Sequence, residues 1–241
     1  MHAGDSSPIG QRITMFYYLL LAHLLADYPL QPTWIVTNKN RRGVVILHAS
    51  IHLLIILIIV WFFNSASVTT ISPYLLFLAV VHLLIDLSKI TLSRIRPNWV
   101  KVPYLLDQLM HILSILFISL VIQTRYGFLA FPANPGWVVL AIAFLFVTYV
   151  WYISERVMTY DDPMYRQALI DDSWSRMLFR AGFLSGFLGI WMWTTKTLAA
   201  SAGAILFPYQ AKKFGRRALF TDLSVSLSVF FLLMLVLNPS F

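Results

Sequence analysis

Four pairs of ionisable residues with i, i+4 spacing lie inside apolar stretches of this chain. This spacing places both side chains of a pair on one face of a helix. Imidazole and carboxylate groups together suit Zn, Fe, Mn or Co ions. The pattern therefore predicts a polar site that four helices build, and its residues are His23/Asp27, His48/His52, His82/Asp86 and Asp107/His111.

The polar pattern repeats along the chain at an offset of 59 residues. The sequence HLLAD at 23–27 recurs as HLLID at 82–86, and the polar residues at 48 and 52 recur at 107 and 111. Rare polar residues in register carry more weight than leucines, which match by chance in apolar helices. We interpret the pattern as a tandem duplication of a helical hairpin, with both copies running in the same direction through the membrane.

The composition excludes most soluble classes. The chain of 241 residues is 59% hydrophobic and only 12% charged, whereas a soluble domain carries about 25% charged residues. There is no cysteine, which excludes thiolate metal sites, disulfides and cysteine nucleophiles. The net charge of +8 is typical of cytoplasmic loops that face anionic lipid, and nucleic acid is the weaker interpretation.

Apolar runs of membrane length predict about seven helices. We expect an all-α integral membrane protein with two parts, a four-helix bundle over 13–124 and accessory transmembrane helices over 125–241. No small-residue cleavage site follows the first run, which we therefore keep as a span. The runs are 13–28, 44–63, 71–92, 103–124, 136–154, 177–195 and 219–237.

Loop charges predict the orientation and the depth of the site. Loops 29–43 and 93–102 carry lysine and arginine, whereas loop 64–70 carries no charge. The positive-inside rule places both charged loops in the cytoplasm. A rise of about 1.5 Å per residue then sets all four pairs roughly 3–15 Å below the cytoplasmic boundary. Asp27, His48, Asp86 and Asp107 form the shallower layer, and His23, His52, His82 and His111 form the deeper one.

Several chemical interpretations of these four pairs compete. Ionisable residues in a span cost about 2.5–3.5 kcal/mol each on insertion scales, and interhelical hydrogen bonds return only about 0.6 kcal/mol apiece. Four pairs at one depth therefore favour one or two divalent transition metal ions, Zn, Fe or Mn, over polar bonding between helices or a proton relay. Haem stays open because histidines of facing helices can bind it from both sides, although the aspartates argue against it.

The sequence favours a metal-dependent hydrolase that acts on a lipid-linked or amphiphilic substrate near the cytoplasmic face. Asp107 or Asp86 would serve as the base. Lys89 either holds a phosphate or carboxylate at the mouth of the site or reaches the membrane interface. We assign Lys39 to a loop, and Gln108 either orients a ligand or faces a neighbouring helix.

Two other functions stay open. A metal or proton transporter needs polar residues that continue across the bilayer, and the first four helices have few. A non-catalytic subunit of a larger membrane complex is the other. We expect membrane lipids as partners and no nucleic acid, while a homo-oligomer or a complex partner stays open. Residues 125–241 contain no histidine, and their carboxylates cluster in loop 155–176 with Asp222 as the exception.

The motifs HLLADYPLQ, the pair at 48 and 52, HLLIDLSK and DQLMH resemble a known family. This is an uncharacterised bacterial family of multi-pass inner-membrane proteins, known only as a numbered domain of unknown function. The likeness covers about residues 15–125. It implies a bacterial plasma-membrane protein, draws attention to the same polar residues and supplies no activity.

Overall fold

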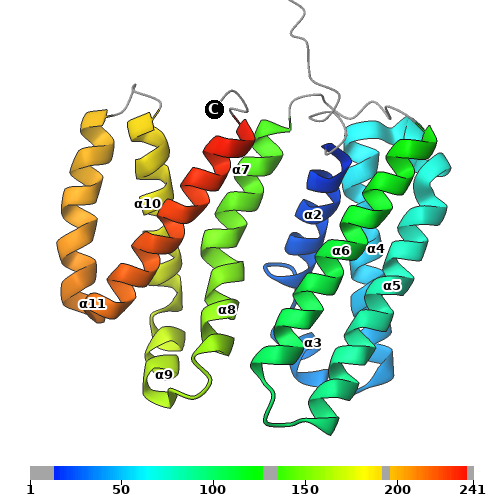
Figure 1. The fold of residues 1–241 in the computed structure, drawn as a ribbon, viewed down its shortest axis with the longest axis horizontal. Coiled ribbons are helices and arrows are strands. Elements are labelled where there is room, and N and C mark those ends of the chain that lie inside the picture. The colour runs from blue at the N-terminus through cyan, green and yellow to red at the C-terminus, as the bar shows by residue number, and fades with distance from the viewer. Residues whose placement is uncertain (1–13, 127–134, 192–195, 238–241) are drawn as a thin grey trace, which may run out of the picture. The chain divides into compact units, whose positions relative to one another are not determined.

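The structure is a computed structural model that describes residues 14–126, 135–191 and 196–237, without the side chains of 192–212. Every regular element in these ranges is helical, as Figure 1 shows. The chain divides into two compact units, Met1–Val138 and Val139–Phe241. The prediction of an all-α protein is therefore confirmed for the part that the structure describes.

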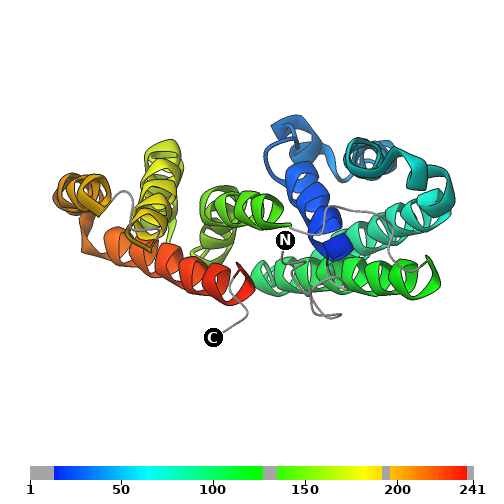
Figure 2. The same ribbon diagram turned by 90° about the horizontal axis from the view of Figure 1, so that it is seen from above.

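Four helices form the bundle of the first unit: α2 (Thr14–Asp27), α4 (Arg42–Asn64), α5 (Val68–Ile95) and α6 (Lys101–Tyr126). They pack as a ring, in which α2 and α5 each contact both α4 and α6 (Figure 2). Each helix turns one stripe of side chains inward. The centre of the bundle is apolar over much of its length, where Leu19, Ile56, Leu75 and Ile118 pack together.

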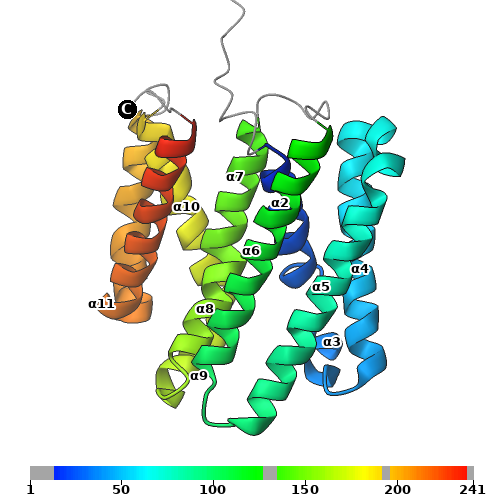
Figure 3. The ribbon, with the colours of Figure 1, turned by 45° about the vertical axis from the view of Figure 1, so that its right-hand side comes forward.

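The turns of the bundle divide between its two ends. The helix α3 (Thr33–Asn38) and the connection from α5 to α6 lie at one end (Figures 1 and 3). There Arg94 donates to the backbone oxygen of Asn40 at 3.3 Å, which joins the two basic loops. The opposite end holds the short 3₁₀ turn η1 (Ser65–Ser67) between α4 and α5.

Membrane-compatible helices occur in both units. Within the described ranges, four helical stretches are long and apolar enough to cross a membrane, and the first of them contains both α4 and α5. They are Arg42–Ile95, Lys101–Tyr126, Gly136–Met158 and Lys213–Leu237. Helix α2 is apolar but shorter, with 14 residues. The all-α membrane class is thus supported by length and composition, while a count of about seven crossings stays a prediction.

The second unit is also helical. It contains most of α7 (Gly136–Leu145), the π-helix η2 (Phe146–Val150), α8 (Trp151–Met158), α9 (Pro163–Asp171), α10 (Ser173–Trp191) and α11 (Lys196–Leu237). Helix α11 consists of two helical segments that meet at Gly215, whose φ of 82° favours glycine. The prediction that 155–176 is a loop is wrong, because helices occupy most of this segment. Helix α8 extends into it, α9 lies in its middle and α10 begins before its end.

Candidate metal centre

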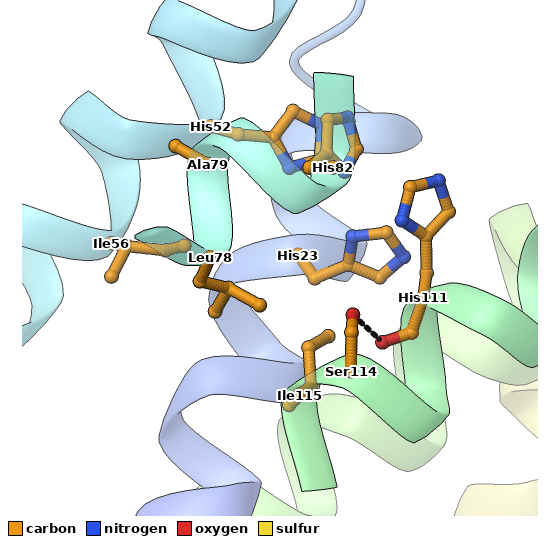
Figure 4. Close-up of a pocket in the computed structure, with 9 residues that line it drawn as sticks. All are labelled: His23, His52, Ile56, Leu78, Ala79, His82, His111, Ser114 and Ile115. Atoms are coloured by element: carbon orange, nitrogen blue, oxygen red, sulfur yellow. Dashed lines mark hydrogen bonds between the residues drawn. The ribbon is translucent and has the colours of Figure 1, made fainter. Parts of the chain in front are cut away.

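All eight residues of the predicted polar pairs meet at one level of the bundle. The imidazoles of His23, His52, His82 and His111 are buried and face one another in Figure 4. The ring centroids of His52 and His82 are 3.7 Å apart, and those of His82 and His111 are 4.2 Å apart. Because the four rings come from α2, α4, α5 and α6, every helix of the bundle contributes to the cluster.

The three aspartates lie beside these rings. Asp27 Oδ1 is 3.0 Å from His48 Nε2 and 3.1 Å from His52 Nε2, so two imidazoles share one carboxylate oxygen. Asp86 Oδ1 is 3.8 Å from His111 Nε2, and its other oxygen is 3.6 Å from His48 Nε2. Asp86 of α5 therefore lies between imidazoles of two other helices, α4 and α6.

Several buried polar atoms in the cluster make no hydrogen bond. The Nε2 atoms of His23, His82 and His111 are in this state, and so is Asp107 Oδ1. The carboxylate oxygens nearest to these nitrogens lie at 3.4–3.9 Å, beyond good hydrogen-bond geometry. Leaving a buried donor or acceptor unbonded costs about 1–3 kcal/mol. Four such atoms together point to a role other than holding the helices together.

The residues of the cluster form groups with the spacing of metal ligands. In each of three groups, one ligand atom per residue lies within 4.8 Å of all the others. His82 and His111 each belong to two groups, so the arrangement accommodates one ion or two adjacent ones. The groups are Asp27, His48, His52 and His82; His23, His82 and His111; and Asp86, Asp107 and His111.

A small cavity adjoins the imidazoles and has room for roughly one water molecule. Its other wall is apolar, with Ile56, Leu78 and Ile115 in Figure 4. Ser114 also lines it, but its hydroxyl donates to the backbone oxygen of His111 at 2.8 Å. Polar ligand atoms thus face an apolar wall across a space of the right size for a small reactant.

Two lysines lie at the carboxylate side of the site. Lys89 Nζ donates to Asp107 Oδ2 at 2.7 Å, and its predicted role in holding a phosphate or carboxylate at the mouth of the site stays a prediction. Lys39 lies in the turn after α3, as predicted, but its Nζ reaches the site and donates to Asp86 Oδ2 at 3.0 Å. The sequence pattern missed Lys39 because a loop has no periodicity that shows where its side chains point.

Amides and a phenol extend this network. Gln31, in the orientation that satisfies both ends of its amide, donates to the backbone oxygen of Asp27 and accepts from Lys39, each at 3.2 Å. Gln108 donates to Asp107 Oδ2 at 3.0 Å and accepts from the Tyr28 hydroxyl at 3.1 Å. Gln108 therefore contacts a candidate ligand, and its role in orienting that ligand stays a prediction.

A second buried cluster lies in the other unit, and the sequence patterns did not predict it. We call it the arginine quartet: Glu155, Arg176, Arg180 and Asp222. Arg176 donates to Glu155 at 2.9 Å and to Asp222 at 2.6 Å, and Arg180 donates to Asp222 at 2.9 Å. Two positive charges thus meet two negative ones.

The π-helix η2 completes the bonding of Arg180. In a regular helix the backbone N–H of Trp151 would bond to the oxygen of Val147, but here it reaches back to Phe146. The oxygen of Val147 is therefore available, and Arg180 Nε donates to it at 2.5 Å. Two signals could have revealed the quartet: the i, i+4 spacing of Arg176 and Arg180, and Asp222 inside an apolar run.

Comparison with known proteins gives a family and no activity. A family model described as "Protein of unknown function (DUF3307)" matches residues 15–135. The match contains all eight candidate ligands together with Lys39 and Lys89. No curated protein and no solved structure matches the chain.

Proposed function

We propose that this chain, which belongs to the DUF3307 family of unknown function, is a metal-dependent hydrolase embedded in the membrane. One observation carries the proposal. Three buried Nε2 atoms, those of His23, His82 and His111, converge without hydrogen-bond partners beside the carboxylates of Asp86 and Asp107. Imidazole nitrogens with carboxylate oxygens suit Zn, Fe or Mn, in one or two ions.

Polar bonding between helices explains the site less well. Such bonding requires donors to meet acceptors, whereas the Nε2 atoms of three histidines meet none in good geometry. A divalent cation would engage these nitrogens and the unbonded oxygen of Asp107 together. The cation would also offset the negative charge that three carboxylates bring into an apolar bundle.

Transport and haem binding also receive less support. Beyond the histidines the described bundle continues as a largely apolar cluster that includes Met15, Val60, Ile71 and Ile122. The imidazole centroids lie 3.7–5.7 Å apart where they pair across helices, which leaves no space for a porphyrin between them. A water-sized cavity fits the hydrolytic proposal better.

In this proposal each side chain of the site has its own role in hydrolysis. A bound ion would lower the pKa of a coordinated water and polarise the bond under attack. Asp107 or Asp86 would accept the proton of that water, and Lys89 would hold Asp107 in place or bind the substrate. The positive-inside rule predicts that the site lies near the cytoplasmic face of a bacterial plasma membrane. The C-terminal helices would be accessory to it. An amphiphilic substrate would reach it from the inner leaflet or the cytosol.

Elemental analysis of the detergent-purified full chain tests the metal site, together with an absorption spectrum of the same sample. We expect one or two equivalents of Zn, Fe or Mn in the wild type and their loss in the double variant His52→Ala/His111→Ala. The matched control is Glu155→Gln, which alters a buried polar group in the other unit and should keep the metal.

Each result has a definite meaning. Metal that is lost only in the histidine variant supports the site and justifies a screen of hydrolytic substrates with the Asp107→Asn and Asp86→Asn variants. A Soret band would replace the proposal with haem binding and electron transfer. No metal after reconstitution would overturn it and leave a proton-handling or structural cluster.

A further inference from the structure

The charges around the site are arranged unequally. All three carboxylates among the described residues of the first unit, Asp27, Asp86 and Asp107, lie in the site. The end of the bundle that holds α3 is rich in exposed arginine, with Arg41, Arg42, Arg94 and Arg96. An approaching ligand therefore meets only positive charge on its way to the site.

Lys39 and Lys89 reach from this basic end to the buried carboxylates. Their side chains are 19% and 31% exposed, whereas Asp86 and Asp107 are 3% and 2% exposed. Each ammonium group thus stands between the solvent-accessible side and one candidate metal ligand. The two lysines come from different elements, the turn after α3 and the C-terminal part of α5, and bind different aspartates.

Metal binding would change the charge around both lysines. With neutral imidazoles, three carboxylates and two ammonium groups leave one net negative charge. One divalent cation, held by the oxygens of Asp86 and Asp107 that lie near His111, would make the site positive. Two ammonium groups beside a positive site attract an anion, and a phosphate group supplies three oxygens to such a cluster.

We propose that Lys39 and Lys89 bind the phosphate of a substrate that is a phosphate ester of a long-chain alcohol. This inference rests on the proposed hydrolase function and names its substrate class. The reaction is hydrolysis: the oxygen of water bonds to phosphorus, and the bond from phosphorus to the alkoxy oxygen breaks. The proton that leaves the water ends on the alcohol, and inorganic phosphate is the second product.

The surroundings of Lys39 favour a lipid as the source of the phosphate. Leu30, Trp34 and Val36 are 51%, 50% and 54% exposed, on α3 and the turn before it. Helix α3 therefore presents apolar side chains a few residues from the lysine. Tryptophan and leucine at such a position are typical of a segment at the membrane interface. An alkyl chain can remain in the bilayer beside α3 while its phosphate reaches the lysines.

The test measures binding of labelled hexadecyl phosphate to the full chain in phosphatidylcholine nanodiscs, with and without Zn²⁺. Glycerol phosphate is the soluble probe, and hexadecanol is the probe without phosphate. The variants are Lys39→Gln and Lys89→Gln, each paired with the Lys→Arg substitution that keeps the charge. Arg42→Gln is the matched control, because it removes an exposed charge at the same end. The metal content of every sample is measured in parallel.

We expect Zn²⁺-loaded wild type to bind hexadecyl phosphate, and each Lys→Gln variant to bind it about tenfold more weakly per metal-loaded protein. The Lys→Arg variants and Arg42→Gln should retain binding. Equal binding by wild type and Lys→Gln variants of full metal content would overturn the phosphate inference and leave the hydrolase proposal standing. Glycerol phosphate that binds as tightly as hexadecyl phosphate would overturn the lipid source. A wild type that takes up no metal would overturn both proposals, and the elemental analysis identifies that case.

Discussion

The two units of this protein bury polar clusters of opposite kinds. In the arginine quartet, two guanidinium groups meet two carboxylates, and a π-helix carbonyl completes the bonding of Arg180. In the histidine cluster, the Nε2 atoms of three imidazoles and one carboxylate oxygen make no hydrogen bond. A complete network holds helices together, whereas the unbonded buried atoms of the histidine cluster are those that the proposed metal site would explain.

The side-chain types agree with this difference. Arginine is always charged and its rigid fork matches a carboxylate, so it suits a permanent ion pair. Histidine is neutral or charged near physiological pH and is the commonest metal ligand among side chains. Stability should therefore depend most on the quartet, and metal binding on the histidines and aspartates of the other cluster.

The largest expected effect comes from breaking the quartet. Arg180→Met leaves Asp222 buried with one cation fewer, and the loss of one partner of a buried ion pair costs about 3–5 kcal/mol. Thermal or denaturant unfolding in detergent measures it. The double variant Arg180→Met/Asp222→Leu leaves Arg176 paired with Glu155 and should recover much of the loss. A double variant as unstable as the sum of both single variants would contradict a closed network.

The next effect concerns the metal. A saturating ion at about 100 times its Kd stabilises the folded chain by about 2.7 kcal/mol. Unfolding of the wild type with Zn²⁺ and with a chelator measures the difference. His52→Ala/His111→Ala should show no such difference, whereas Glu155→Gln should keep it. A similar loss in both variants would remove the distinction between the clusters.

A smaller effect separates the stability of the chain from its metal binding at one residue, His23. His23 Nε2 has no hydrogen-bond partner, so His23→Leu removes no bond at that nitrogen. Leucine has a similar volume, and such a substitution changes the stability of the metal-free chain by less than about 1.5 kcal/mol. The metal content should fall all the same. A loss as large as that of Arg180→Met would place His23 among the residues that hold the bundle together.

The smallest effect lies outside the membrane-spanning stretches. The backbone N–H of Tyr165 and the Arg217 guanidinium both bond to Asp162 and hold the pKa of its carboxyl below the ordinary value. The stability that this contact supplies is therefore present above the unfolded pKa of about 3.9. It is lost as pH falls through the lower folded pKa. Melting temperatures of wild type and Asp162→Asn should differ at neutral pH and converge in acid, since asparagine still caps α9.

Sequence patterns predicted the histidine cluster well because helical spacing is local. An i, i+4 pair shares a helix face wherever the helix goes, and short connections place neighbouring helices side by side. Four faces with polar residues at one depth can then only meet at the centre of the bundle. Whether the two hairpins arose by duplication remains a prediction.

The quartet and the contact of Lys39 could not be predicted, because both depend on tertiary packing that no local sequence pattern contains. Arg180 and Asp222 are 42 residues apart, and their pairing depends on how α10 packs against α11. Treating 155–176 as a loop also gave no reason to place Glu155 beside Arg176. Lys39 follows α3, and only the path of that turn directs its side chain to Asp86.

The wide turn of η2 has a consequence for the evolution of this helix. A π-helix of this kind contains one residue more than the α-helix it interrupts. Here the extra residue releases the Val147 oxygen for Arg180. Deletion of one residue within Phe146–Val150 would restore regular α-helix and deprive the guanidinium of an acceptor. We therefore expect the insertion and the arginine to be inherited together, so that related chains without an arginine at position 180 are one residue shorter in this helix.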